Sequence, residues 1–190
     1  EVRAVLMAVG RRPVVPAGLE AAGIEVSPRG FVVTDENMKT TRAGVYAVGD
    51  CNGRMMLAHA ASAQAEKIYD PSVNLDVIPS AVFTVPEVAM VGKTQDQLEA
   101  DGVSFKASKS LFAANGKAQA LGEPDGFVKV LYDPETRKML GCHIIGPHAA
   151  DLIHEAAIIM ANGLTVDQLG LVTVHGHPTL GETLMSACRL

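Results

Sequence analysis

The residues with the clearest chemical potential lie near the C-terminus, in the segment HGHPTLGE from His175 to Glu182. It holds two histidines, a proline directly after the second, and a glutamate five residues beyond that histidine. Proline suits the first turn of a helix and pushes the preceding residue out of helical geometry. We therefore expect His177 to be extended at a helix entrance, with Glu182 on the second turn of the helix that follows.

A histidine just outside a helix and a carboxylate just inside it can form a hydrogen-bonded pair. The carboxylate then orients the ring and stabilises its protonated form, which is the arrangement used in general acid–base catalysis. A loop histidine beside a solvated glutamate has the same sequence pattern. The choice between a catalytic pair and a plain surface pair therefore depends on the elements that position His177 and Glu182.

Composition narrows the class of protein. The chain has 190 residues, of which 48% are hydrophobic, so it can bury a core and is not expected to be disordered. The net charge of −5 and the lack of a basic stripe argue against a general nucleic-acid binder. No apolar run approaches the ~20 residues needed to cross a bilayer.

The three cysteines, Cys51, Cys142 and Cys188, lie far apart in the sequence. None forms a CxxC pair or has the spacing of zinc ligands, so we expect no metal site. Reduced, unreactive thiols in a cytosol-like compartment are the expectation.

The N-terminal segment Val2 to Val9 (VRAVLMAV) predicts a buried strand that runs into Gly10. Because a buried parallel strand needs neighbours on both sides, we expect the chain to be part of a longer protein. Gly10 allows close approach of the backbone to a neighbouring element or a ligand, although a plain turn would also use glycine.

A second candidate binding region follows. Val45 to Val48 predicts a short strand that ends at Gly49-Asp50, and helical character begins at Leu57. Open α/β sheets bind ligands beyond the carboxyl ends of strands and near helix N-termini. Asp50 is suited to accept hydrogen bonds from sugar-type hydroxyls, and the amides of Met56 to His59 are suited to an anion or a polar ring edge. Asp50 as a helix-capping residue is the alternative.

Residues 70–79 have the composition of a linker and predict a domain boundary. The pattern beyond it is α+β, with short alternating or apolar segments that are typical of strands. The expected strands are 81–85, 88–91, 103–108, 117–121, 127–132 and 139–145.

Thr94 to Gln97 has the spacing of a capping box and opens a short helix that Gly102 ends. A longer helix is expected from Pro147 to about Met160. Its apolar residues cover more than one face, which suggests burial by the sheet and by another helix, such as one of a partner subunit. A second capping box, Thr165 to Gln168, opens a short helix that leads to the HGHPTLGE segment.

Taken together, these segments resemble the flavin-dependent pyridine nucleotide–disulfide oxidoreductases, and within that family most closely the dihydrolipoyl dehydrogenases. His175 favours these over glutathione reductases, and the C-terminus lacks the paired cysteines of mercuric reductases, the two alternatives within the family. The resemblance covers nearly the whole chain. It rests on AVGRRP (8–13), TTRAGVYAVGD (40–50), MLAHAASAQ (56–64), PSAVFTVPEVAMVG (79–92), GCHIIGPHA (141–149) and HGHPTLGE (175–182).

The family implies a homodimeric flavoprotein with an FAD domain, an NAD domain and a C-terminal interface domain. By this resemblance, residues 1–34 end the NAD domain, 35–76 end the FAD domain, and 77–190 form the interface domain. The interface domain is an antiparallel sheet with flanking helices, preceded here by partial Rossmann-like α/β pieces. The implied location is cytoplasmic, or the mitochondrial matrix in a eukaryote, and the implied partners are lipoyl domains of 2-oxoacid dehydrogenase or glycine cleavage complexes.

The resemblance also implies roles for individual residues. His177 matches the base that takes a proton from the dithiol substrate, and Glu182 matches its orienting carboxylate. Gly10 matches a position where the backbone approaches NAD, and Asp50 matches an aspartate that binds the ribityl chain of FAD. His175 is expected either to be structural or to support the catalytic residues, rather than to be catalytic itself. The positions whose backbone groups meet the flavin ring are Met56, Leu57, Ala58 and His59.

Two features depart from the family pattern. The redox-active cysteine pair and both glycine-rich phosphate fingerprints are absent, so we expect this chain alone to be inactive and to retain little or no FAD. The helix after Gln64 is short, because Glu66 to Asp70 runs straight into the linker, through either a deletion or missing residues. A stand-alone, non-catalytic dimerisation module is the alternative to a fragment of an enzyme.

Overall fold

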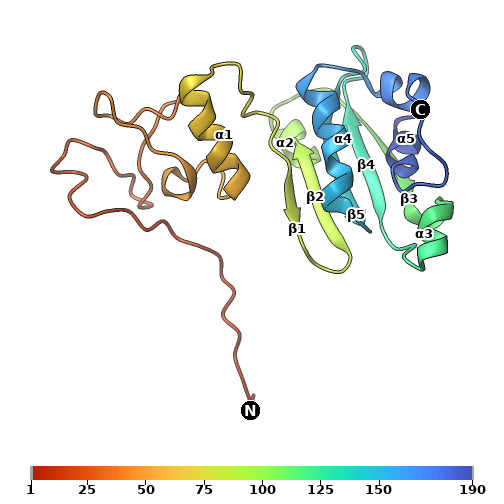
Figure 1. Ribbon diagram of the computed structural model, residues 1–190, viewed down its shortest axis with the longest axis horizontal. Helices are drawn as coiled ribbons and strands as arrows, with labels where there is room; N and C mark the ends of the chain where they lie inside the picture. The colour runs from red at the N-terminus through yellow and green to blue at the C-terminus, as the bar shows by residue number, and fades with distance from the viewer. Residues whose placement is uncertain (1, 190) are drawn as a thin grey trace. The chain divides into compact units, whose positions relative to one another are not determined.

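The computed structural model describes residues 2–189, which form two compact units divided between Leu75 and Asp76 (Figure 1). The first unit is built around helix α1 (Ala58–Tyr69), and the second around a five-stranded sheet. No helix in the described range is long and apolar enough to cross a membrane.

In the first unit, α1 and the short 3-10 helix η1 (Gly49–Asn52) pack together. Gln64 of α1 is buried, and its Oε1 accepts hydrogen bonds from the Gly49 amide and from Asn52 Nδ2, both at 2.8 Å. Buried polar groups need such partners, so Gln64 fixes the turn that carries Asp50 against the helix.

Much of the first unit before α1 contains turns and single bridges where the sequence predicts strands. The strand predicted at 45–48 contributes only the isolated bridge Lys39–Tyr46, and the bridges Val26–Val32 and Thr34–Thr40 are likewise single. The strand predicted for residues 2–9 is wrong: these residues are exposed, and no described residue pairs with them. A strand without a neighbouring ladder has no partners for its backbone groups.

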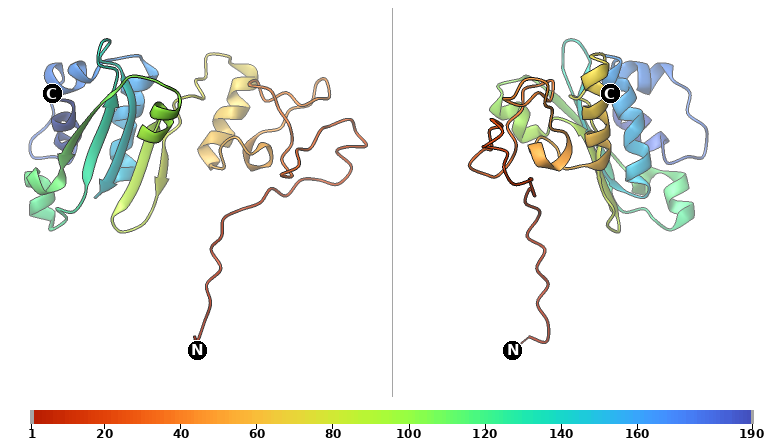
Figure 2. Two further views of the ribbon diagram at one scale, coloured as in Figure 1. Left: turned by 180° about the vertical axis from the view of Figure 1, so that it is seen from behind. Right: turned by 60° about the vertical axis from the view of Figure 1, so that its left-hand side comes forward.

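The second unit is an antiparallel sheet in the order β1-β2-β5-β4-β3. Helices α4 (Ala149–Ala161) and α5 (Glu182–Cys188) pack against it (Figures 1 and 2). The α+β class with an antiparallel sheet and flanking helices is therefore confirmed. The strands are β1 (Ser80–Val82), β2 (Glu87–Gly92), β3 (Lys106–Leu111), β4 (Phe127–Tyr132) and β5 (Met139–Gly146).

The core of this unit joins alternate residues of the central strands to the apolar side of α4. Val128 and Val130 of β4 and Ile144 of β5 are buried in one cluster with Ile153 and Ala156. Alternation in the strands and helical spacing in α4 place these side chains on facing surfaces. The sequence predicts that the sheet buries one side of α4, and the structure confirms this.

Two short helices show where local hydrogen bonding decides the structure. The capping box of α2 (Gln95–Ala100) forms as predicted, with Thr94 and Gln97 each accepting from the other's backbone amide. The strand predicted at 117–121 is wrong, because this segment is helix α3 (Gly116–Leu121). Asn115 Oδ1 caps it by accepting from the amides of Lys117 and Ala118, at 2.9 and 3.0 Å.

The segment that leads to HGHPTLGE is fastened at its start. The second capping box forms between Thr165 and Gln168 and is followed by one turn of π-helix, η3 (Gln168–Val172). Asp167 accepts two hydrogen bonds from the Arg137 guanidinium, at 2.9 and 2.7 Å. Arg137 also lies over the Tyr132 ring, so the β4–β5 hairpin holds the beginning of this segment in place.

Candidate functional site

His177 and Glu182 lie together in the structure. His177 Nδ1 is 3.0 Å from Oε1 and 3.2 Å from Oε2 of Glu182. Because an ionised carboxylate can only accept, Nδ1 is the donor, which leaves Nε2 as the basic atom of the ring. The His177 side chain is 78% exposed and that of Glu182 is 22% exposed. The pair therefore presents an accessible base on a more buried carboxylate.

The helix that carries Glu182 begins later than the sequence predicts. Glu182 is the first residue of α5, after Gly181 at the N-cap, rather than a residue of its second turn. Its Oε2 also accepts from the Thr179 amide at 2.8 Å, which fixes the carboxylate against the preceding turn. A negative charge at this end of the helix is favoured by the unpaired amides there.

Asn115, from the segment before α3, fastens the same turn from outside. Its Nδ2 donates to the Thr179 carbonyl and to Thr183 Oγ1, each at 2.9 Å. Thr179 Oγ1 in turn donates to the Gly176 carbonyl at 2.7 Å. The sequence analysis missed Asn115, although an asparagine before a glycine and a lysine is a recognisable helix cap.

These contacts act on the charge of Glu182. The hydrogen bond from the Thr179 amide, and after it the one from His177, holds the pKa of the Glu182 carboxyl below its ordinary value of 4.5. The carboxylate is therefore ionised throughout the neutral range. It can orient the imidazole and stabilise its positive charge after proton uptake.

A cleft of about 260 Å³ opens beside the pair. Its lining combines side chains of β3, the α3 cap and α5. The lining residues are Ser110, Leu111, Ala114, Asn115, Gly116, His177, Glu182, Thr183, Met185 and Ser186.

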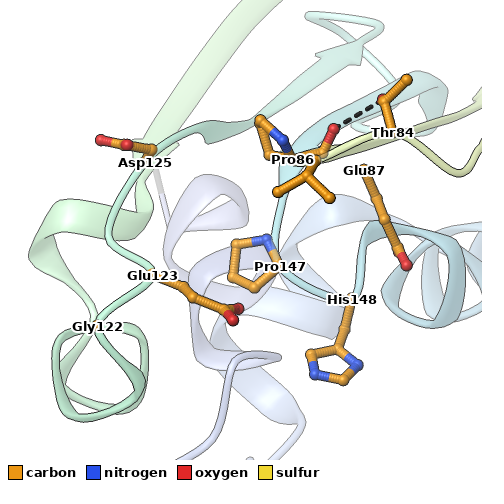
Figure 3. Close-up of a pocket in the computed structure, with 9 residues that line it drawn as sticks. Thr84, Pro86, Glu87, Gly122, Glu123, Asp125, Pro147 and His148 are labelled. Atoms are coloured by element: carbon orange, nitrogen blue, oxygen red, sulfur yellow. Dashed lines mark hydrogen bonds between the residues drawn. The ribbon is translucent and has the colours of Figure 1, made fainter.

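A larger pocket of about 400 Å³ lies elsewhere in the second unit, between the β1–β2 loop and the start of α4. Its acidic side chains Glu87, Glu123 and Asp125 are spread around it rather than converging on one point (Figure 3). Glu87 Oε2 accepts from the Ala150 amide at 3.0 Å, which assigns that carboxylate to the helix N-terminus. The smaller cleft holds the His177–Glu182 pair at hydrogen-bond distance, whereas His148 of the larger pocket lies 3.7 Å from Asp151.

The candidate cofactor residues are in the first unit. Asp50 lies in η1 with a half-exposed carboxylate, 3.9 Å from Arg11, the residue after Gly10. It does not cap α1, whose N-cap Leu57 makes no side-chain cap hydrogen bond. Met56, Ala58 and His59 are exposed and Leu57 is partly buried. A helix N-terminus without a side-chain cap, together with a half-exposed carboxylate in the same unit, fits the polar groups of a dinucleotide such as FAD.

The low pKa of Glu182 generates a pH prediction. A carboxyl whose pKa is lower in the folded state stabilises the fold above its unfolded value, and that stability is lost as the pH falls through the folded pKa. We expect a ¹³C NMR titration of the Glu182 carboxyl to give a pKa below 4.5. The stability difference between the wild type and Glu182→Gln should shrink as the pH falls below about 4.5. A measured pKa at or above 4.5 contradicts the observed hydrogen bonding.

Two family models match the chain. Residues 78–188 match the dimerisation domain of the pyridine nucleotide-disulphide oxidoreductases, and residues 1–65 match the pyridine nucleotide-disulphide oxidoreductase model itself. The first match covers the sheet, the loop that carries His177 and helix α5, which carries Glu182.

Curated relatives and solved structures agree with these matches. Dihydrolipoyl dehydrogenase from Chlorobaculum parvum is 45% identical over 98% of this chain and 41% of its own length. The mitochondrial enzyme of Sus scrofa is 39% identical over 96% of the chain and 37% of its own length. The chain thus spans about two fifths of the relatives it matches.

Among solved structures, LpdA from Mycobacterium tuberculosis has a TM-score of 0.88 at 30% identity and covers 97% of this chain and 42% of its own. The HOCl-induced flavoprotein disulfide reductase RclA from Escherichia coli has a TM-score of 0.85 at 26% identity, covering 96% and 44%. The predicted resemblance is confirmed, and the chain belongs to the pyridine nucleotide-disulphide oxidoreductase family.

Proposed function

We propose that this chain is the C-terminal portion of a flavin-dependent dihydrolipoyl dehydrogenase, which oxidises dihydrolipoamide to lipoamide with NAD⁺. Its part in that reaction is to supply His177 as the base and Glu182 as the orienting acid. The observation that carries the proposal is the hydrogen bond from exposed His177 Nδ1 to Glu182, within the domain matched by the dimerisation model.

The proposed role follows from the chemistry of thiols. A thiol of pKa ~8.5 is mostly neutral near pH 7 and reacts as a nucleophile only after it loses its proton. His177 Nε2 takes the proton from one thiol of the substrate, and the charge on the ring is stabilised by Glu182. The resulting thiolate attacks one sulfur of a disulfide, and the other sulfur leaves as a thiolate.

That disulfide has to come from outside this chain. Its three cysteines are free, and two of them, Cys142 and Cys188, are buried. Burial raises the pKa of Cys188 to about 12 and that of Cys142 further still, so neither forms a thiolate at neutral pH. We therefore propose that the chain alone is inactive and works with the remainder of a longer enzyme.

The cofactor assignments belong to the same proposal. Asp50 and the backbone of Met56 to His59 would hold FAD, and Gly10 would lie against NAD. Two-electron transfer to NAD⁺ from the dithiol that forms when this disulfide is reduced is the chemistry that FAD would supply when bound. In this proposal the chain divides into the end of an NAD domain (1–34), the end of an FAD domain (35–76) and an interface domain (77–190). The proposed partners are a second copy of the chain and lipoyl domains, in the cytoplasm or the mitochondrial matrix.

A chimera tests the function. This chain would replace the matching segment of the Chlorobaculum parvum enzyme, to which it is 45% identical. We expect NAD⁺-dependent oxidation of dihydrolipoamide by the chimera and none by the chain alone. His177→Asn should lower turnover about 100-fold or more, since a positioned base contributes roughly 10²–10⁴.

The matched control is His148→Asn, which changes an exposed histidine at a left-handed position that asparagine tolerates. It should retain most of the activity. A His177→Asn chimera as active as the control contradicts the proposed base. A chimera that reduces glutathione disulfide instead would favour the glutathione reductase alternative.

Helix α4 generates a prediction for the dimer. Ile158 is 61% exposed on a helix whose other side packs on the sheet, so a large apolar side chain is left uncovered in one chain. We expect sedimentation velocity to show a dimer and Ile158→Glu to shift it to a monomer. Leu121→Glu on α3, at another exposed apolar position, is the control and should leave the dimer intact. A monomeric wild type at micromolar concentration would rule out the proposed self-association.

A further inference from the structure

A second histidine–carboxylate pair lies beside the first. His175 Nε2 is 2.8 Å from Glu155 Oε1, which joins the loop before His177 to the middle of α4. The His175 side chain is only 9% exposed, and that of Glu155 is 33% exposed. Unlike His177, this histidine is not open to a substrate.

The second pair lies directly beneath the turn that presents the first. A Cβ placed on Gly181 would be 3.6 Å from His175 Cδ2 and 3.8 Å from Glu155 Oε2. Gly181 is the N-cap of α5, and Glu182 is the next residue. Gly181 therefore lies between the His175–Glu155 pair and Glu182 of the other pair.

The loop between η3 and α5 has few other anchors. Val174 is exposed, as are Leu171 and Val172 at the end of η3, so burial in the core does not hold this end of the loop, whereas Leu180 at the other end packs against the core. Asn115 fastens the loop near Thr179, and the Glu155–His175 bond fastens its other end. A hydrogen bond to a carboxylate is roughly twice as strong as one between neutral groups, and it fixes the direction of the ring.

The protonation of His175 follows from its surroundings. Glu155 accepts from Nε2–H, so in the neutral ring Nδ1 carries no proton. Nδ1 is buried without a hydrogen-bond partner among the described residues, so it faces no competing donor. The ring thus makes a single polar contact, and that contact is with Glu155.

We propose that Glu155 and His175 form a positioning pair, which holds the loop so that His177 and Glu182 keep their hydrogen bond. This inference rests on the proposed role of His177 as the base. A displacement of about 1 Å in such a constellation costs on the order of 100-fold in rate, so the anchor has a measurable effect even though it never contacts the substrate.

The test compares two variants that both remove the imidazole of His175. His175→Gln keeps a donor for Glu155, whereas His175→Phe keeps a ring of similar shape without a donor. The first readout is the ¹³C NMR titration of the Glu182 carboxyl in the 190-residue chain. We expect a higher pKa in His175→Phe than in His175→Gln, because only the phenylalanine variant releases the loop and weakens the hydrogen bonds to Glu182.

The second readout is turnover in the chimera. His175→Phe should lower kcat about tenfold with little change in KM, and His175→Gln should restore most of it. The same Glu182 pKa and the same kcat in both variants would overturn the proposal. If the phenylalanine variant does not fold, Glu155→Leu and Glu155→Gln replace the two variants, since both remove the charge and only glutamine keeps an acceptor for His175 Nε2. The same Glu182 pKa and kcat in these two variants would likewise overturn it.

The two readouts separate this inference from the proposed function. If the chimera does not oxidise dihydrolipoamide at all, the function fails while the titration still tests the positioning. If the chimera is active and neither readout distinguishes the variants, the positioning fails while the function stands.

Discussion

The carboxylate of Glu182 is the point on which the candidate site depends. It stands at the first position of α5 and accepts hydrogen bonds from His177 Nδ1 and from the Thr179 amide. Removing either donor would leave the carboxylate with fewer partners, and removing the carboxylate would free the ring of His177. The turn from Gly176 to Glu182 is held in place by the hydrogen bonds from Asn115 and by the packing of α5 on β3 and β4.

In the second unit the candidate catalytic side chain is exposed, and the side chains that bond to its loop are buried. His177, the proposed base, is open to solvent, whereas Asn115 and His175, which bond to or within its loop, are largely buried. They come from different parts of the chain, namely the N-cap of α3 and the loop itself, and Glu155 comes from α4. A sheet with packed helices can therefore hold an exposed histidine in a fixed position. Acid–base catalysis commonly requires such positioning.

The sequence predicts well where the information is local. The bounds of β4 agree with the alternating pattern of 127–132, and the capping boxes at Thr94 and Thr165 form with the residues expected. The pairing of His177 with Glu182 follows from their short spacing. The resemblance of six segments is sufficient for the family, because their order along the chain is as informative as their composition.

The sequence prediction fails where a helix cap overrides the strand pattern, where a strand lacks partners, or where distant residues form a bond. The segment 117–121 alternates like a strand, yet the cap from Asn115 makes it helical. The segment 2–9 is apolar and β-branched, but its strand needs partners that the described residues do not provide. The Glu155–His175 bond joins residues 20 positions apart across a helix end and a loop, and no periodicity indicates it.

The central claim is that Glu182 sets the tautomer of His177 and so leaves Nε2 free to take a proton. The ¹⁵N chemical shifts of the two ring nitrogens, measured above the pKa of the ring, test it directly. We predict that Nδ1 carries the proton and that Nε2 shows the shift of an unprotonated nitrogen. In Glu182→Gln the preference for this tautomer should weaken. A wild-type ring with its proton on Nε2 would contradict the account, because the atom assigned as the base would already be protonated.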